Sequence, residues 1–235
     1  NIIYQKVIIM KKTIFCLLVF LVSMSLFAGG GKETATVEEK DNIITMAIPV
    51  DPDGLDPMLT AAASTFQITS NIYETLITVD EKGNLEPCLA DSWSISEDGL
   101  SISFNLRENA AFSNGKKCGS EEVKESFIRL MSPESLRCKD YSFISEIETP
   151  DEKTIVFKMN EINVAALSSF AYPWAAVVDT EESNLKNKPM GTGPYCLSSW
   201  VPQEKLVLAL NPYYGKEVKN DGFVLVVMPD LTAEI

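Results

Sequence analysis

The stretch GTGPY, residues 191–195, raises the question whether this loop binds a phosphate or only turns the chain, and the answer guides the interpretation of the fold. Two glycines separated by one residue also occur in phosphate loops, but a dinucleotide fingerprint needs a third glycine and a following helix, and a Walker loop needs Gly-Lys-Ser/Thr. Here Pro194 and Tyr195 follow, and then strand-like residues. We therefore predict that the glycines let the backbone turn tightly where it enters a strand, and that this loop holds no phosphate.

The bulk composition is that of a globular protein with one or two packed cores. Of the 235 residues, 46% are hydrophobic and 23% are charged, and the formal net charge is −13. Removal of residues 1–31, which carry three lysines and no acid, would move this charge from −13 to −16. Such an acidic body repels polyphosphate, so we expect no nucleic-acid partner.

The first thirty residues have the order of a secretory signal: a basic start, a short apolar middle and a small-residue exit. The apolar run 13–28 is shorter than the roughly 20 residues that span a bilayer, although an uncleaved anchor stays open as an alternative. We expect this signal to export the protein to a periplasmic or other extracytoplasmic location, and no lipobox cysteine is seen. We assign residues 1–9 to upstream translation, 10–30 to a signal peptide and 31–41 to a linker, with folding from Asn42.

Cysteine and histidine usage limits the chemistry. The chain has no histidine, which excludes a Ser-His-Asp triad and argues against zinc and heme, and we expect no cofactor and no metal. Four cysteines follow the signal: Cys88, Cys118, Cys138 and Cys196. They allow three disulfide pairings, or they can serve as small buried hydrophobic residues.

Hydrophobic periodicity predicts a mixed α/β (α+β) class, because hairpin signals alternate with amphipathic helices. The clearest helix is 120–131, where Val123, Phe127 and Leu130 form a stripe, Ser120 can cap and two acids follow. A second helix is expected over 61–74. Strands are expected at 43–49, 101–107, 154–159, 205–210 and 223–228, the last one covered on both sides.

No pattern indicates an enzyme. The paired acids Glu121–Glu122 and Glu181–Glu182 could in principle do acid–base work. Adjacent residues on a helix do not face a common point, and acidic runs are usually a solvated face. We predict that the protein is not an enzyme and keep a secreted hydrolase only as a remote alternative.

The order of several short motifs is more specific than any one of them. This order resembles the family 5 extracellular solute-binding proteins of ABC importers, which bind dipeptides, oligopeptides or nickel, over roughly residues 42–235. The motifs are LDP (55–57), IYETL (72–76), EPCLADSW (86–93), SEDG (96–99), LR (106–107), FSNG (112–115), GTGPY and NPYYG (211–215). Tyr214 stands where the family usually has Trp.

The resemblance implies a three-domain, periplasmic-binding-protein-like clamshell, of which this sequence holds the N-terminal half. It assigns residues 42–74 and 178–235 to a discontinuous first lobe and residues 75–177 to a second domain. We expect the sequence to stop before the third lobe. In such proteins, GTGPY lies where the chain returns to the first lobe.

The resemblance also implies the ligand-binding residues. Ser64, Thr65 and Phe66 follow the LDP turn in a segment that lines the cleft in relatives, although Phe66 could be core and the two hydroxyls could cap the helix. Tyr141 stands where relatives project an aromatic residue toward the ligand, with packing as the alternative, and Trp174 is a weaker candidate. Ala175 stands where nickel binders have an arginine, which disfavours nickel.

The function implied is that of an extracytoplasmic binding component that captures short peptides and delivers them to the ABC permease. A peptide backbone would be gripped by main-chain hydrogen bonds, and hinge closure would enclose it. A nickel-chelate, oligosaccharide or other solute binder on the same scaffold stays open, because fold does not fix ligand. The resemblance implies a small solute and the permease subunits as partners.

Overall fold

A four-stranded sheet is built from the two ends of the described chain. The computed structural model describes residues 42–229; the expected signal peptide, the upstream residues and the linker lie outside them. The strand order is β1-β10-β9-β8, with β1 parallel to β10 and the other pairs antiparallel. The bounds are β1 Ile43–Ile48, β8 Tyr195–Val201, β9 Lys205–Leu210 and β10 Gly222–Val227.

A second four-stranded sheet lies in the middle of the sequence and is antiparallel throughout, in the order β4-β5-β7-β6. Its alternating side chains place Ile102, Phe104 and Leu106 on the buried face, as the sequence predicts. The bounds are β4 Ala90–Ile95, β5 Ser101–Leu106, β6 Ile144–Glu148 and β7 Thr154–Met159, and a small hairpin joins β2 Ile77–Val79 to β3 Leu85–Pro87.

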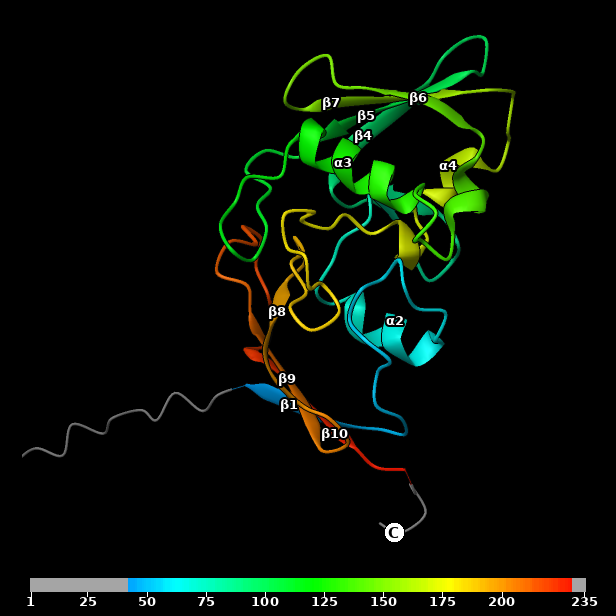
Figure 1. Ribbon diagram of the computed structural model, residues 1–235. Coiled ribbons are helices and arrows are strands. Elements are labelled where there is room, and N and C mark those ends of the chain that lie inside the picture. The colour runs from blue at the N-terminus through cyan, green and yellow to red at the C-terminus, as the bar shows by residue number, and fades with distance from the viewer. Residues whose placement is uncertain (1–41, 230–235) are drawn as a thin grey trace, which may run out of the picture. The chain divides into compact units, whose positions relative to one another are not determined.

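Helix α3 (Ser120–Leu130) covers this second sheet, as Figure 1 shows. Its stripe Val123, Phe127 and Leu130 is buried, which confirms the predicted helix. Phe127 packs against Phe157 with ring centroids 4.8 Å apart. The predicted N-cap, Ser120, was wrong by one residue. The N-cap is Gly119, whose N–H donates to Glu122 Oε2 at 2.9 Å.

The predicted helix 61–74 was too long. Helix α2 covers only Ala63–Thr69. Beyond it, the side chain of Asn71 donates to the carbonyl of Gln67 at 2.8 Å, which satisfies a helix-end carbonyl. The following residues pair instead with two later segments of the chain. The carbonyl of Ile72 accepts from the N–H of Gly193, and the carbonyl of Glu74 accepts from the N–H of Val177, each at 2.9 Å.

The GTGPY loop crosses close to this junction. A Cβ at Gly191 would lie 2.2 Å from the carbonyl oxygen of Ile72, and a Cβ at Gly193 would lie 2.6 Å from the carbonyl carbon of Ile72. Glycine is therefore required here by the close approach of two backbones. Strand β8 begins at Tyr195, so the predicted entry into a strand is confirmed.

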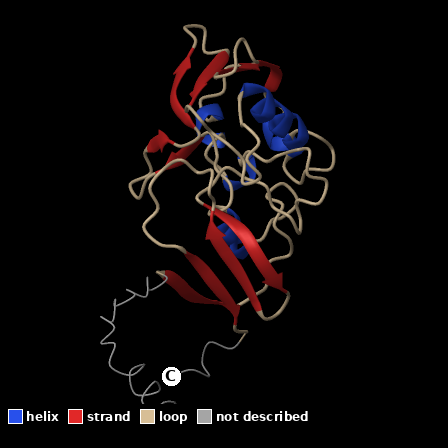
Figure 2. Ribbon diagram, turned by 90° about the vertical axis from the view of Figure 1, so that its left-hand side faces the viewer, coloured by secondary structure: helices blue, strands red, loops and turns tan. Residues whose placement is uncertain are grey.

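The remaining short elements are η1 Cys138–Tyr141, α4 Ala166–Ser169 and η2 Pro173–Ala175. Figure 2 shows that the segments between the sheets are mostly loops and short helices. Residues Cys88, Cys118, Cys138 and Cys196 are all free thiols. Within residues 42–229, no helix has the length and apolarity needed to cross a membrane.

Candidate functional site

An aromatic cluster forms where α2 meets η2. The ring of Phe66, on α2, lies 5.9 Å from that of Trp174, on η2. Tyr172 stacks on Trp174 at 4.6 Å with an interplanar angle of 23°. The guanidinium of Arg137 lies 4.3 Å from the centroid of the Trp174 ring, at cation–π distance. We call Phe66, Arg137, Tyr172 and Trp174 the Trp174 platform.

Local structure explains how the platform is held. Pro173 begins η2 directly after Tyr172, whose backbone is extended. Proline suits the first turn of a helix because it has no N–H to leave unpaired. On the other side, Thr65 Oγ1 donates to Asp53 Oδ1 at 2.8 Å and so fastens α2 to the preceding turn. Both aromatic side chains are therefore presented from anchored segments.

The predicted ligand-binding residues separate into two groups. Phe66 and Trp174 are brought together, and both are half-buried, as is Ser64 on α2. Thr65 is buried, and its hydroxyl already donates a hydrogen bond to Asp53. Tyr141 has 0% of its surface exposed, and its hydroxyl donates to the carbonyl of Ser169 at 2.7 Å. Burial raises the pKa of Tyr141, so this phenol stays protonated.

Ligand contact by these five residues stays a prediction. Ser64, Phe66 and Trp174 have surface to offer in the described structure, whereas Thr65 and Tyr141 support their neighbours from beneath. Tyr141 packs its ring 6.2 Å from that of Phe127, in the core under α3. Contact with a ligand would require these two side chains to become accessible.

Two platform residues were missed by sequence reasoning. Tyr172 carried a partial signal, since it stands two residues before the predicted Trp174 and the residue before a proline is biased toward an extended backbone. Arg137 carried no signal, because it is far from Trp174 in the sequence and belongs to no pattern. Its guanidinium also forms an ion pair with Asp140, with Nη1 3.8 Å from Oδ2.

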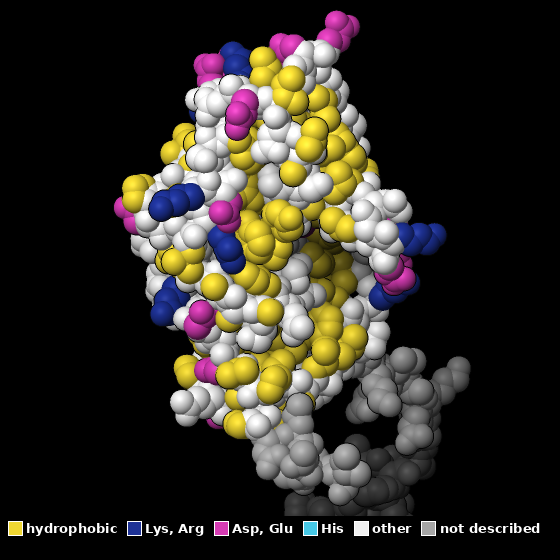
Figure 3. Space-filling model, turned by 90° about the vertical axis from the view of Figure 1, so that its right-hand side faces the viewer, with side chains coloured by type: hydrophobic (Ala, Val, Ile, Leu, Met, Phe, Trp, Pro, Cys, Tyr) yellow, Lys and Arg dark blue, Asp and Glu magenta, His cyan; other side chains and the backbone are white. Residues whose placement is uncertain are grey.

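The platform offers apolar and aromatic surface with one guanidinium beside it. Figure 3 views the side of the molecule that carries α2 and shows hydrophobic side chains gathered around a hollow. Such a surface can hold apolar or planar groups and one anionic group. Within residues 42–229, no three His, Cys, Asp or Glu side chains are grouped so that they could hold a metal ion.

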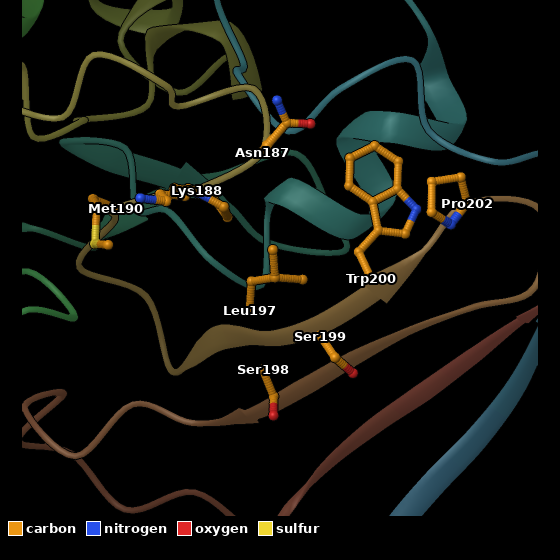
Figure 4. Close-up of a pocket in the computed structure, with 9 residues that line it drawn as sticks. Asn187, Lys188, Met190, Leu197, Ser198, Ser199, Trp200 and Pro202 are labelled. Carbon is orange, nitrogen blue, oxygen red and sulfur yellow. The ribbon is translucent and has the colours of Figure 1, made fainter.

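Two of the cavities in residues 42–229, one beside β8 and one beside η2, are the larger ones outside the platform. One, of about 400 Å³, is lined by Leu197 and Trp200 of β8 and by the loop before it, which includes Lys188 and Met190 (Figure 4). Its Trp200 donates through Nε1 to Asp51 Oδ1 at 3.1 Å. The other, of about 410 Å³, lies beside η2 and the end of α2. Neither is lined by any of the five predicted ligand-binding residues.

The arrangement of the two sheets is shared with solved binding proteins. The periplasmic binding protein DppA of Helicobacter pylori, solved with the peptide STSA, has a TM-score of 0.73 and 26% identity, over 80% of this chain and 43% of that one. A nickel ABC transporter structure from Bacillus halodurans has a TM-score of 0.73 and 32% identity, over 82% and 40%. The fold is that of a mixed α/β periplasmic binding protein.

The family follows from the sequence match. The family described as bacterial extracellular solute-binding proteins, family 5 Middle, matches residues 84–235, and this chain belongs to that family. This confirms the resemblance found in the motifs. Among curated relatives, the probable D,D-dipeptide-binding periplasmic protein DdpA of Escherichia coli is 29% identical over 76% of this chain and 38% of its own length. The chain thus spans about two fifths of the length of the relatives it matches.

Proposed function

We propose that this protein is the extracytoplasmic binding component of an ABC importer and that it captures short peptides. The observation that carries this is the likeness, over 80% of the chain, to a binding protein solved with the peptide STSA. The family consists of solute-binding proteins and not of enzymes. The signal expected at residues 10–30 would deliver the protein to the compartment where such capture occurs.

The mechanism is enclosure without a chemical step. The Trp174 platform forms one wall, and a facing lobe would supply the other wall together with the acid that pairs with a peptide's amino terminus. Main-chain hydrogen bonds to an extended peptide are indifferent to its side chains, so one site accepts many sequences. Closure about a hinge then buries the ligand, and the closed form is what the permease receives.

A nickel-chelate binder is the second candidate, because the nickel ABC transporter structure from Bacillus halodurans is 32% identical to this chain. Against it stands Ala175 at the place where the resembled nickel binders have an arginine. The sequence also has no histidine, so none of its residues can offer nickel an imidazole ligand.

Calorimetry on the complete gene product separates these proposals. We expect heat of binding with a panel of di- and tripeptides and none with nickel–histidine chelate. Heat from the chelate alone would overturn peptide capture. Purified residues 32–235 should bind the same peptides feebly, because in this mechanism the facing lobe supplies the other half of the contact surface. Micromolar affinity for residues 32–235 alone would contradict the two-walled mechanism.

Substitution at the platform tests its role in the proposed function. Trp174→Ala should weaken peptide binding by about tenfold, which corresponds to loss of an aromatic contact of about 1.4 kcal/mol. The matched control is Trp93→Ala, since Trp93 is also half-buried but lies on β4, away from the platform. Equal weakening by both substitutions, measured by calorimetry, would show that the loss comes from general destabilisation.

A further inference from the structure

The cavity of about 400 Å³ beside β8, which we call the β8 cavity, is formed by a strand whose alternation is interrupted. Leu197 and Trp200 both line it, although they are three residues apart. In a regular strand, side chains at this spacing would point to opposite faces of the sheet. The register of β8 against β9 shifts between Leu197 and Ser199, so Ser198 is an extra residue. Such a bulge re-aims the side chains that follow it.

The register shows that Leu197 and Trp200 share one face of the sheet. Leu197 lies opposite Leu208, and Trp200 lies opposite Leu206. Leu206 and Leu208 are two residues apart on β9 and both are buried, so their side chains lie on the same, core-facing side. Figure 4 shows Leu197 and Trp200 on the side of β8 where Lys188 lies. The bulge thus builds an apolar wall from two side chains that a regular strand would separate.

The orientation of the Trp200 ring is fixed by a hydrogen bond. Its Nε1 donates to Asp51 Oδ1 at 3.1 Å, and Asp51 Oδ2 accepts from the N–H of Gln203 at 3.0 Å. Both oxygens of this carboxylate are therefore used, and Asp51 does not line the cavity. The cavity volume also falls in the range of small-molecule sites, about 300 to 1,000 Å³, and such sites are usually preformed.

The charge of the lining has one sign. Among the nine residues that line the β8 cavity, Lys188 alone is charged, and its side chain is exposed. Within residues 42–229, Lys188 forms no ion pair. The lining thus has the opposite charge to the chain as a whole, whose net charge is −13. An anionic group is favoured here, whereas a second cation would meet like charge.

We propose that the β8 cavity binds a small apolar carboxylate, a molecule with an aromatic or branched aliphatic body and one negative charge. The body packs against Leu197, Trp200 and Met190, whose thioether suits contact with a ring. The carboxylate pairs with the ammonium of Lys188 on the solvent side. The proposal does not depend on peptide capture, because none of the five residues predicted to bind the peptide lines this cavity.

The test uses the complete gene product and four matched probes. Phenylacetate carries the body and the charge, phenylacetamide the body alone, acetate the charge alone, and phenethylammonium the opposite charge. Binding is followed by saturation-transfer NMR and by titration. We expect saturable binding of phenylacetate, binding of phenylacetamide about two- to fivefold weaker, since an exposed ion pair contributes little, and no binding of the other two probes. High salt should reduce the preference for phenylacetate by screening the exposed charges.

Three variants locate the binding. Lys188→Gln should remove the preference for phenylacetate over phenylacetamide and leave the affinity for the amide unchanged. Leu197→Phe should abolish binding of both by filling the cavity, since Leu197 lines it and is half-buried. The matched control is Lys186→Gln, because Lys186 is an exposed lysine of the same loop that does not line the cavity. Binding by Lys186→Gln should equal that of the parent chain.

The other results overturn the proposal. A cavity that holds only water gives no saturable signal with phenylacetate. Equal affinities of the parent chain for phenylacetate and phenylacetamide would show that the charge is not recognised, and equal weakening by Lys186→Gln and Lys188→Gln would show an effect of net charge. Unchanged binding in Leu197→Phe would place the probe elsewhere. Circular dichroism melting curves establish that each variant is folded, and peptide binding is measured separately, so the two proposals fail separately.

Discussion

The two four-stranded sheets differ in how completely the described chain covers them. In the β4-β5-β7-β6 sheet, Phe104 and Phe157 are fully buried beneath α3. In the β1-β10-β9-β8 sheet, the edge strand β1 has apolar side chains that stay open, with Ile43 44%, Ile44 41% and Met46 49% exposed. An edge strand with apolar residues on both faces is a surface for further protein. Within residues 42–229 the β4-β5-β7-β6 sheet is thus covered, and we call it the covered sheet; the β1-β10-β9-β8 sheet keeps an exposed apolar edge, and we call it the open sheet.

The largest effect expected from this difference is on stability. Phe157→Ala removes a ring packed between Phe104, Phe127 and Phe170, so it should cost about 3 to 5 kcal/mol. The matched change in the open sheet is Phe223→Ala, whose ring is only partly buried beside Tyr195, and it should cost about 1 kcal/mol or less. Urea unfolding followed by far-UV circular dichroism measures both values.

Equal costs for the two substitutions would mean that the open sheet is as well packed as the covered one. The slope of the transition with urea is compared as well, since a change in slope would show that the unfolded or native surface had changed.

Sequence patterns predicted part of each sheet: the expected strands agree with β1, β9 and β10 of the open sheet and with β5 and β7 of the covered sheet, whereas β4 and β6 were not predicted. Alternation in SISFNLR and the stripe of the following helix are local signals, and each places its side chains correctly when the core lies within the same segment. The apolar run at 223–228 predicted a strand covered on both sides. That prediction was wrong for the described residues, since only Gly222 and Leu225 of β10 are buried and its other residues are half-buried.

The site was harder to predict than the fold. Phe66 and Trp174 were named, and the structure joins them, but their contact depends on how α2 and η2 meet and not on either segment alone. Arg137 reaches Trp174 through a tertiary contact that has no sequence period. Tyr141 is buried although it stands among polar neighbours, since the short helix η1 turns it toward Phe127.

An effect of intermediate size is expected on the alkylation rates of two cysteines, one beside each sheet. Cys118 is buried beside the covered sheet, and Cys196 on β8 of the open sheet is half-buried. Burial raises the pKa of both thiols, so at neutral pH both are protonated and the reactive thiolate grows as pH rises. At pH 8, iodoacetamide should label Cys196 on the order of a hundredfold faster than Cys118, because Cys118 must wait for local or global opening.

Mass spectrometry of tryptic peptides measures these rates. Labelling of Cys196 in the folded protein should increase from pH 7 to pH 9, and labelling of Cys118 should become fast only in urea. Rapid labelling of Cys118 without denaturant would mean that the covered sheet opens as readily as the open one.

The smallest effect is expected on the open edge itself. Met46→Thr removes an apolar side chain from β1 that is already half exposed, and threonine keeps a high preference for strands. We expect the free energy of unfolding to change by less than about 0.5 kcal/mol, while binding of a hydrophobic dye and self-association fall. The matched control is Met159→Thr on β7, whose side chain is buried, so that substitution should destabilise markedly. The two methionines differ mainly in how much of the side chain is exposed. A large loss of stability from Met46→Thr in the purified chain would therefore show that β1 is covered in solution. The contrast between the two sheets would then be incorrect.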